Sequence, residues 1–560
     1  MTRYKHIGLV VLATLILSAG CQPALPNPTS APTSARGWRA SALNMTGIIS
    51  WLFAACPILV VLALMVGLGR SAMVAGAVGW LIAALVAVLR FGADLDLILI
   101  SQGKALLLSL DVLLIVWTAL LLFQVTNAAG AVVMLGRQLT LLTTDRALQA
   151  LLLAWMFTAF LQGVGGFGVP VAIIAPLLVT LGFDPTAAVL MPALGHAWGA
   201  TFGSLASAFQ ALIATSGLSG RMLAPGAAAM LALAGLAGGV SVAHIADGWK
   251  GVRRNAVTLV VVGAVMGSVQ WALVVIGLWT IATFSAGLAG IGVGVMLTRR
   301  RSTLTPLPSP SEGEGSKELA LSLAACAILV VLAIVVLVVP SVYAALGHVV
   351  IHIDFPQAQT ATGHVTPAGP GRTISLLNHT GAILATASLL AFGVYSAAGR
   401  YAPNARSAGA RILSTMLRKL AEPTAGIVTM VDMATMMSHA GMTDMLAGGL
   451  ASSVGAAFPL VSPLIGALGA FMTGSNTNSN VVFVMLQMRT ADLLRLSVPL
   501  ILASQTTGAA VGSVISPAKV VVGCSSTGQT GREGIVMRAM LPYILAILML
   551  IGAVTFAVAR

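Results

Sequence analysis

Charged residues and cysteines are scarce in this chain. Asp, Glu, Lys and Arg together make up 8% of the 560 residues, whereas 58% are hydrophobic. A water-soluble domain carries about 25% charged residues, so the composition excludes a soluble protein. The four cysteines show no CxxC spacing, which argues against a disulfide framework, a zinc site and redox chemistry.

Motifs that carry enzyme chemistry are also missing. The sequence contains no GxSxG, HExxH or paired-aspartate pattern, so we expect no enzyme, cofactor or metal site. The net charge of +14 comes from 29 basic and 15 acidic residues. No basic cluster interleaved with aromatic residues occurs, which argues against a nucleic-acid partner. Basic residues in short loops instead set the orientation of a membrane protein.

Apolar runs of membrane-spanning length dominate the rest of the chain. A hydrocarbon core of about 30 Å needs about 20 apolar residues per helix, and about twelve such runs are present. This pattern predicts an all-α polytopic membrane protein of the bacterial plasma (inner) membrane, with the lipid bilayer around it. The basic residues favour an orientation in which the loop at 299–318 lies inside and the first helix, which begins near Ile48, starts outside.

The amino terminus resembles a bacterial secretory signal. Residues 1–21 comprise a basic start, an apolar stretch and a lipoprotein-like box that ends at Cys21. Lipidation of Cys21 and a misassigned start, with Met45 as the true beginning, are both open. Residues 22–47 form a Pro/Ser/Ala-rich linker that we expect to be disordered.

A repeated hexapeptide divides the chain into two halves. Gly199–Ser204 (GATFGS) recurs as Gly508–Ser513 (GAAVGS), and each copy follows a proline and, further upstream, a glycine-rich break. We therefore predict halves at 48–298 and 319–560, joined by the polar linker 299–318.

Each half is expected to hold a re-entrant hairpin followed by an interrupted helix. The hairpins are predicted at 147–181 and 455–489, in opposite orientations, as in inverted-repeat secondary transporters. Broken helices inside a membrane are tolerated only where they line protein or a watery cavity. Because helix N-termini carry partial positive charge, we expect the substrate at the membrane midplane to be an anion such as a carboxylate.

Three stretches carry a resemblance to a known family. GGFGVPVAIIAPLLVTLGFDP from Gly165, FMTGSNTNSNVVFVMLQ from Phe471 and TTGAAVGSVISPAKVVVGCSSTGQTGRE from Thr506 resemble the bacterial L-lactate permease family. The resemblance implies a secondary active transporter of small 2-hydroxy monocarboxylates, lactate and glycolate, coupled to protons. From the breaks and this resemblance together, the predicted substrate-binding residues are Gln162, Gly165, Gly166, Gly168, Gly474, Ser475, Asn476, Thr477, Asn478, Asn480, Thr507 and Lys519.

Four positions depart from the family pattern. Gln162 and Asn476 stand where family members commonly have glutamate and aspartate, His439 stands where tyrosine is usual, and Lys519 replaces glutamine. An amide keeps the capacity for hydrogen bonds but cannot take up a proton. The family's proton carriers therefore cannot simply be transferred to this chain.

Other ionisable groups are candidates for proton coupling. Asp111 and Asp432 lie within apolar runs, where an ionisable group costs about 3 kcal/mol and is a functional candidate. His196 directly precedes the first repeat, and His439 is seven residues from Asp432. We predict coupling through His196, Asp432 and His439, with Asp111 either a fourth member or a scaffold partner of Lys104.

Several alternatives stay open at the level of sequence. Sodium is the competing coupling ion, since Asn, Ser and Thr oxygens suit a hard cation. A carrier of another organic anion, a channel and a membrane-embedded enzyme are more distant readings. The oligomeric state is open, with a homodimer as one option.

Overall fold

A computed structural model describes residues 45–559 apart from residues 132–133, 135–138, 140–142, 144, 166–167, 302–311 and 402–403. The signal-like segment 1–21, its Cys21 and the linker up to residue 44 lie outside the described residues, as does Gly166. Helix α3 already begins at Met45, so the last residues of the expected linker are helical.

The elements described in the first half of the chain are all helices, joined by short turns. Its elements are α3 (Met45–Leu62) with a π-turn to Gly67, α4 (Ala72–Phe91), α5 (Leu95–Ala128), α7 (Arg146–Leu151), π-helical η2 (Leu152–Phe157), α8 (Thr158–Val164), α9 (Val169–Thr180), α10 (Pro185–His196), α11 (Ser207–Ser216), α12 (Gly220–Arg254), α13 (Ala256–Val275) and α14 (Trp279–Arg301).

The second half combines helices with a short β-ribbon. Its helices are α15 (Glu312–Val338), α16 (Pro340–Leu346), α17 (Thr380–Ala397), α18 (Ala405–His439), α19 (Met442–Val454), α20 (Phe458–Thr473), α21 (Asn476–Leu493), α22 (Val498–Gly512), α23 (Pro517–Ser526) and α24 (Glu533–Val558). Because α14 reaches Arg301 and α15 starts at Glu312, the linker between the halves is shorter than the predicted 299–318.

Twelve helical segments in the described part of the chain are long and apolar enough to cross a membrane. This number confirms the predicted all-α polytopic architecture. The set differs in detail from the apolar runs of the sequence. The run at 184–215 is expected to form one crossing but is divided between α10 and α11, and the crossing expected to begin at 423 belongs to α18, which begins 18 residues earlier. The amino-terminal part of α18 carries exposed arginines and was predicted as a loop.

Acidic side chains begin several of these helices. Asp94 accepts a hydrogen bond from the backbone N–H of Leu97 (2.8 Å), and Asp184 accepts bonds from the first turn of α10. An N-cap of this kind satisfies backbone donors that have no partner within the helix. Asp94, Asp145 and Asp184 therefore have a structural role at the starts of α5, α7 and α10.

Two helix–turn–helix units occupy the positions predicted for hairpins. In the first, α7, η2 and α8 run to Gly165, and α9 returns from Gly168, so that Arg146 Nη2 donates to Gly182 O (2.7 Å). In the second, α20 and α21 pack along each other, and Gln487 Nε2 donates to Ser462 O (2.9 Å). The two ends of the first unit thus lie side by side, and the two arms of the second unit pack together.

Each unit is followed by an interrupted helix, as predicted. Between α10 and α11 the chain forms a 3-10 turn at Ala197–Gly199 and then a left-handed turn at Ser204, Leu205 and Ala206, whose φ angles are 46°, 57° and 66°. Three consecutive non-glycine residues in this region are strained and occur where the surrounding structure holds them. Between α22 and α23 the break is the 3-10 turn Ser513–Ile515.

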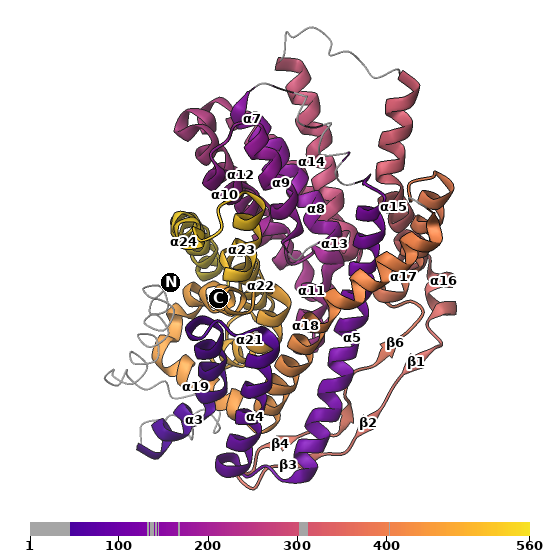
Figure 1. Ribbon diagram of the computed structural model, residues 1–560. Coiled ribbons are helices and arrows are strands. Elements are labelled where there is room, and N and C mark those ends of the chain that lie inside the picture. The colour runs from indigo at the N-terminus through magenta and orange to yellow at the C-terminus, as the bar shows by residue number, and fades with distance from the viewer. Residues whose placement is uncertain are drawn as a thin grey trace.

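A β-ribbon at 350–375 was not predicted. It consists of three antiparallel pairs, β1 (Val350–Ile351) with β6 (Ile374–Ser375), β2 (Asp354–Phe355) with β5 (Gly369–Pro370), and β3 (Ala358–Gln359) with β4 (Val365–Thr366). The ribbon follows α5 along one side of the molecule (Figure 1) and reaches the α4–α5 turn, where Ala361 N donates to Gly92 O (2.8 Å).

Contacts at the opposite end of the molecule join segments that the charge distribution assigns to the inside. Arg254 pairs with Asp145 (3.0 Å) and Asp247 (2.8 Å), and Arg400 pairs with Glu318. The ribbon, the α4–α5 turn and the end of α18, all assigned to the outside, meet one another instead. This separation is consistent with the predicted orientation.

Candidate functional site

The turn of the second unit contacts the break in the first half. Asn476 Nδ2 donates to Thr201 Oγ1 (3.0 Å), and the Thr201 hydroxyl donates to Thr506 O (3.2 Å). Asn480 Nδ2 donates both to Thr506 Oγ1 (3.0 Å) and to Ala208 O (2.9 Å). These side chains are buried, and they join the neighbouring helices α21 and α22 to the α10–α11 break, which lies far from them in the sequence.

The break in the second half lies against both turns. Gly168, with φ 82°, faces the side chain of Lys519, whose Nζ donates to Ser513 Oγ (2.9 Å). Gly474 has a φ of 67°. A Cβ atom added at this position would lie nearest to Ser516 and Ala518. Both turn glycines adopt left-handed backbone conformations that disfavour a side chain.

Gln162, near the end of α8, lies against the first break. The backbone of Gly203 approaches Gln162 so closely that a Cβ atom at position 203 would overlap Gln162. In the same break, Gly199 O accepts a hydrogen bond from Thr283 Oγ1 (3.4 Å). Gln162 is 3% exposed, and its Oε1 has no partner among the described residues. Gly165 ends α8 beside Phe123, at the start of the turn.

Several predicted site residues keep a buried polar atom without a hydrogen-bond partner in the described part of the chain. Leaving such an atom unpaired costs roughly 1–3 kcal/mol, so a polar ligand or ion that satisfies it gains binding free energy. The atoms are Gln162 Oε1, His196 Nε2, Asn476 Oδ1, Asn478 Oδ1, Asn480 Oδ1 and Thr507 Oγ1. Ser516 Oγ, which was not predicted to belong to the site, is likewise unpaired there. Thr477 is buried in the first turn of α21.

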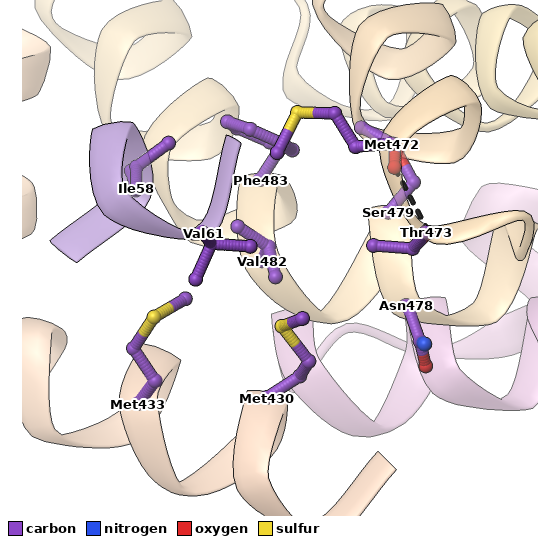
Figure 2. Close-up of a pocket in the computed structure, with 11 residues that line it drawn as sticks. Ile58, Val61, Met430, Met433, Met472, Thr473, Asn478, Ser479, Val482 and Phe483 are labelled. Atoms are coloured by element: carbon purple, nitrogen blue, oxygen red, sulfur yellow. Dashed lines mark hydrogen bonds between the residues drawn. The ribbon is translucent and has the colours of Figure 1, made fainter. Parts of the chain in front are cut away.

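Asn478 belongs to a different environment from Asn476 and Asn480. It lines a small, mostly apolar cavity with Met430 and Met433 of α18 and Ile58 and Val61 of α3 (Figure 2). The cavity holds about 10 Å³, room for about one water molecule. Of the predicted asparagines, Asn476 and Asn480 thus bond to Thr201 and Thr506, whereas Asn478 faces α18.

Two of the candidate proton carriers, His196 and His439, lie in different parts of the fold. His196 is fully buried at the first break, where its Nδ1 donates to Pro192 O (2.5 Å) and Lys519 acts on it electrostatically. His439, at the end of α18, lies beside the ribbon, because Thr366 Oγ1 donates to its carbonyl (3.3 Å). One carboxylate oxygen of Asp432 and the His439 Nδ1 have no partner among the described residues.

Asp111 is held by an ion pair. Arg372 Nε donates to Asp111 Oδ2 (2.8 Å) and His379 Nε2 to Asp111 Oδ1 (3.0 Å). His379 Nδ1 accepts a hydrogen bond from the backbone of Gly381, so its proton is on Nε2. Lys104 instead donates to Pro367 O (3.1 Å), and the expected pairing of Asp111 with Lys104 is therefore wrong. Arg372 lies between β5 and β6 of the ribbon, so the ribbon brings it to Asp111.

Thr201, Thr506 and Ser513 were missed as site residues. Thr201 and Ser513 lie within the two repeat hexapeptides, and Thr506 precedes Thr507 in α22. The repeat is therefore a sequence signal for Thr201 and Ser513, whereas Thr506 lies two residues before its second copy. No group of three or more His, Cys, Asp or Glu side chains suited to a metal occurs in the described part of the chain.

Comparison with known proteins decides the family. The model of the L-lactate permease family matches residues 50–560. The chain belongs to the L-lactate permease family. The permease is 26% identical to the glycolate permease GlcA of Escherichia coli K12, over 92% of this chain and 97% of that protein. It is also 26% identical to the L-lactate permease of Halalkalibacterium halodurans, over 87% of this chain and 92% of that one.

A solved structure is similar over a large part of the permease. The YdaH transporter of Alcanivorax borkumensis aligns with a TM-score of 0.43 at 16% identity, over 83% of this chain and 87% of that chain. Family membership and the twelve candidate spans establish the permease as a multi-pass membrane transporter and not an enzyme, consistent with the bacterial inner membrane.

Proposed function

We propose that the permease is a secondary active transporter that carries lactate and glycolate by proton-coupled symport. Relatives that match over most of their length bear the names L-lactate permease and glycolate permease. The observation that carries the proposal is the bonding of Asn476 to Thr201 and of Thr201 to Thr506, which brings a turn and a break from different halves together. Inverted-repeat carriers bind substrate at such a junction.

The site suits a small 2-hydroxy carboxylate. Lys519, with the N-termini of α9 and α21, would neutralise the carboxylate, because helix N-termini present free N–H groups and partial positive charge. Gln162 Oε1, Asn476 Oδ1 and Asn480 Oδ1 have no partner in the described residues and could accept the hydrogen bond of the substrate's 2-hydroxyl group. The Thr507 hydroxyl, also without a partner there, would donate to a carboxylate oxygen. The other predicted site residues, at the two turns, would provide backbone donors.

Two features support inverted re-entrant hairpins. The ends of the first unit meet through Arg146 and Gly182, on the side that the charges assign to the inside. The second unit, at 458–493, begins and ends near residues assigned to the outside. Hairpins that enter from opposite sides and meet at breaks are the architecture expected of halves 48–298 and 319–560.

Proton coupling is assigned to His196, Asp432 and His439. Each is at least half-buried and keeps a titratable atom without a partner among the described residues, so a proton can be gained or lost there without breaking an ion pair. Asp111 differs, because Arg372 and His379 already occupy both its oxygens. We infer that Asp111 holds the ribbon to α5, and a role in proton coupling is the alternative.

Sodium coupling is the second candidate, and a specific observation favours it. Asn476 Oδ1 and Asn480 Oδ1 are buried oxygens without a partner in the described residues, and oxygen ligands of this kind suit a hard cation. Proton coupling and sodium coupling predict different responses of lactate uptake to an imposed pH gradient.

Uptake of labelled lactate into proteoliposomes tests both readings. An imposed pH gradient, inside alkaline, should drive accumulation in the absence of sodium. The double variant His439→Gln with Asp432→Asn should abolish this gradient-driven accumulation while lactate exchange persists. A matched control is His352→Gln with Asp354→Asn, an exposed His–Asp pair on the ribbon (3.3 Å). Accumulation that requires a sodium gradient, or that survives the double variant, would contradict proton coupling through these residues.

A further inference from the structure

A cavity near the inner end of the molecule is separate from the transport site. It lies between the carboxyl-terminal end of α5 and the amino-terminal part of α18, which pack against each other and cross in Figure 1. Its volume is about 110 Å³, room for several water molecules. The lining residues are Gln124, Ala128, Tyr401, Ala408, Arg411, Ile412 and Thr415.

Polar donors dominate the lining. Gln124 is 6% exposed, and its Nε2 has no hydrogen-bond partner in the described part of the chain. Arg411 is exposed at the surface end of the cavity, and none of the lining residues is acidic. The Tyr401 hydroxyl donates to Val125 O (3.2 Å), and this bond holds the ring in place at one side of the cavity. A buried amide donor and a guanidinium around one cavity suit an anion.

The surroundings place this cavity at the membrane interface. Leu413 and Leu417, one turn apart on α18, are 52% and 60% exposed, as expected of side chains that contact acyl chains. Arg406 and Arg418 are exposed on the same helix. A helix that carries exposed leucines and arginines together lies at the boundary between hydrocarbon and headgroups. Basic pockets between helices on the cytoplasmic side bind anionic lipid headgroups.

We propose that this cavity binds the phosphate headgroup of an anionic phospholipid from the inner leaflet, with Arg411 and Gln124 as donors. The phosphate oxygens accept from the Arg411 guanidinium and the Gln124 amide, and the acyl chains lie along Leu413 and Leu417. Bound lipid then ties α18 to α5 at the inner end. The site does not depend on the identity of the transported anion.

Native mass spectrometry of the full-length permease in detergent tests the site. Titration with short-chain phosphatidylglycerol should give saturable binding that phosphatidylcholine of the same chain length does not match. Arg411→Gln should weaken binding about tenfold, since a charge-assisted hydrogen bond contributes roughly that factor. Gln124→Leu, a second and independent variant, should weaken it several-fold. Arg406→Gln, an exposed arginine of the same helix outside the cavity, is the matched control and should bind as the unaltered chain does.

Three results would overturn the proposal. Equal binding of the two lipids would show that the headgroup charge is not recognised. Equal weakening by Arg411→Gln and Arg406→Gln would reduce the effect to general surface charge. Displacement of phosphatidylglycerol by inorganic phosphate or lactate at its own binding concentration would reassign the cavity to a small soluble anion.

Discussion

The Nδ2 of Asn476 donates a 3.0 Å hydrogen bond to the Oγ1 of Thr201. Asn476 begins α21 directly after the second turn, and Thr201 lies in the break between α10 and α11, 275 residues away in the sequence. Both side chains are buried, with Asn476 6% and Thr201 0% exposed. This bond links the two halves where a substrate would contact both, while Asn476 Oδ1 keeps its acceptor capacity.

Removing this link should impair transport. Asn476→Ala removes the bond to Thr201 and an oxygen available to substrate, so we expect lactate uptake to lose at least about tenfold in Vmax/KM, equivalent to about 1.4 kcal/mol. Initial rates in proteoliposomes give the value. Asn378→Ala, which removes a bond to Tyr343 O (3.4 Å) and belongs to neither turn nor break, is the control and should keep near-normal rates. Equal losses in the two variants would contradict a specific role for Asn476.

A side chain at the second turn should affect transport more than stability. Gly474 and Gly399 share a φ of 67°, so alanine at either position carries a similar backbone penalty of about 1–2 kcal/mol. Gly474 faces Ser516, whereas Gly399 has nothing near its would-be Cβ. We expect Gly474→Ala to abolish most uptake and Gly399→Ala to preserve it, at similar melting temperatures. Similar uptake in both variants would mean that the turn does not line the substrate path.

Replacing the buried cation should weaken substrate binding. Lys519→Gln restores the residue that the family tends to have, and it removes the charge that donates to Ser513 Oγ (2.9 Å). We expect the KM for lactate to rise about tenfold, as for loss of a charge-assisted hydrogen bond. Lys419→Gln, at an exposed position on α18, should leave the KM unchanged. An unaltered KM in Lys519→Gln would assign the carboxylate to the helix N-termini alone.

The ion pair of Asp111 should matter mainly for stability. Asp111→Asn leaves Arg372 and His379 without their carboxylate, and breaking a buried pair costs about 3–5 kcal/mol. We expect a melting temperature several degrees lower in detergent, with unchanged dependence of uptake on the pH gradient. Asp354→Asn, whose carboxylate is 71% exposed, should change neither property. Normal stability with lost pH dependence would instead place Asp111 in the proton path.

The helical framework was predictable because apolar runs of membrane length determine it. The hexapeptide repeat located both breaks, and the turns fall at the predicted glycines, Gly168 and Gly474. The β-ribbon was not predictable, because its three two-residue pairs alternate with Pro and Gly and depend on contacts with α5. The sequence predicts a loop where α18 begins, because several arginines lie there before the apolar run.

The side-chain partners were harder to predict than the elements. Nothing local in the sequence links Asp111 to Arg372, because the ribbon that brings them together forms only in the folded chain. Thr201 and Thr506 meet for a similar reason, since each becomes part of the site only when α22 packs against the first break. Amides at 162 and 476 were identified from the sequence, whereas their bonding partners came from the structure.

Access of water and lactate to the second turn tests the central claim most directly. In a chain whose native cysteines are replaced, Ser475→Cys is treated with a membrane-impermeant thiol reagent in right-side-out and inside-out vesicles. We predict reaction from at least one side, slowed about tenfold at a lactate concentration about ten times its Kd, because only about a tenth of the sites is then empty. No reaction from either side, or reaction at the same rate with and without lactate, would contradict a substrate site at this turn.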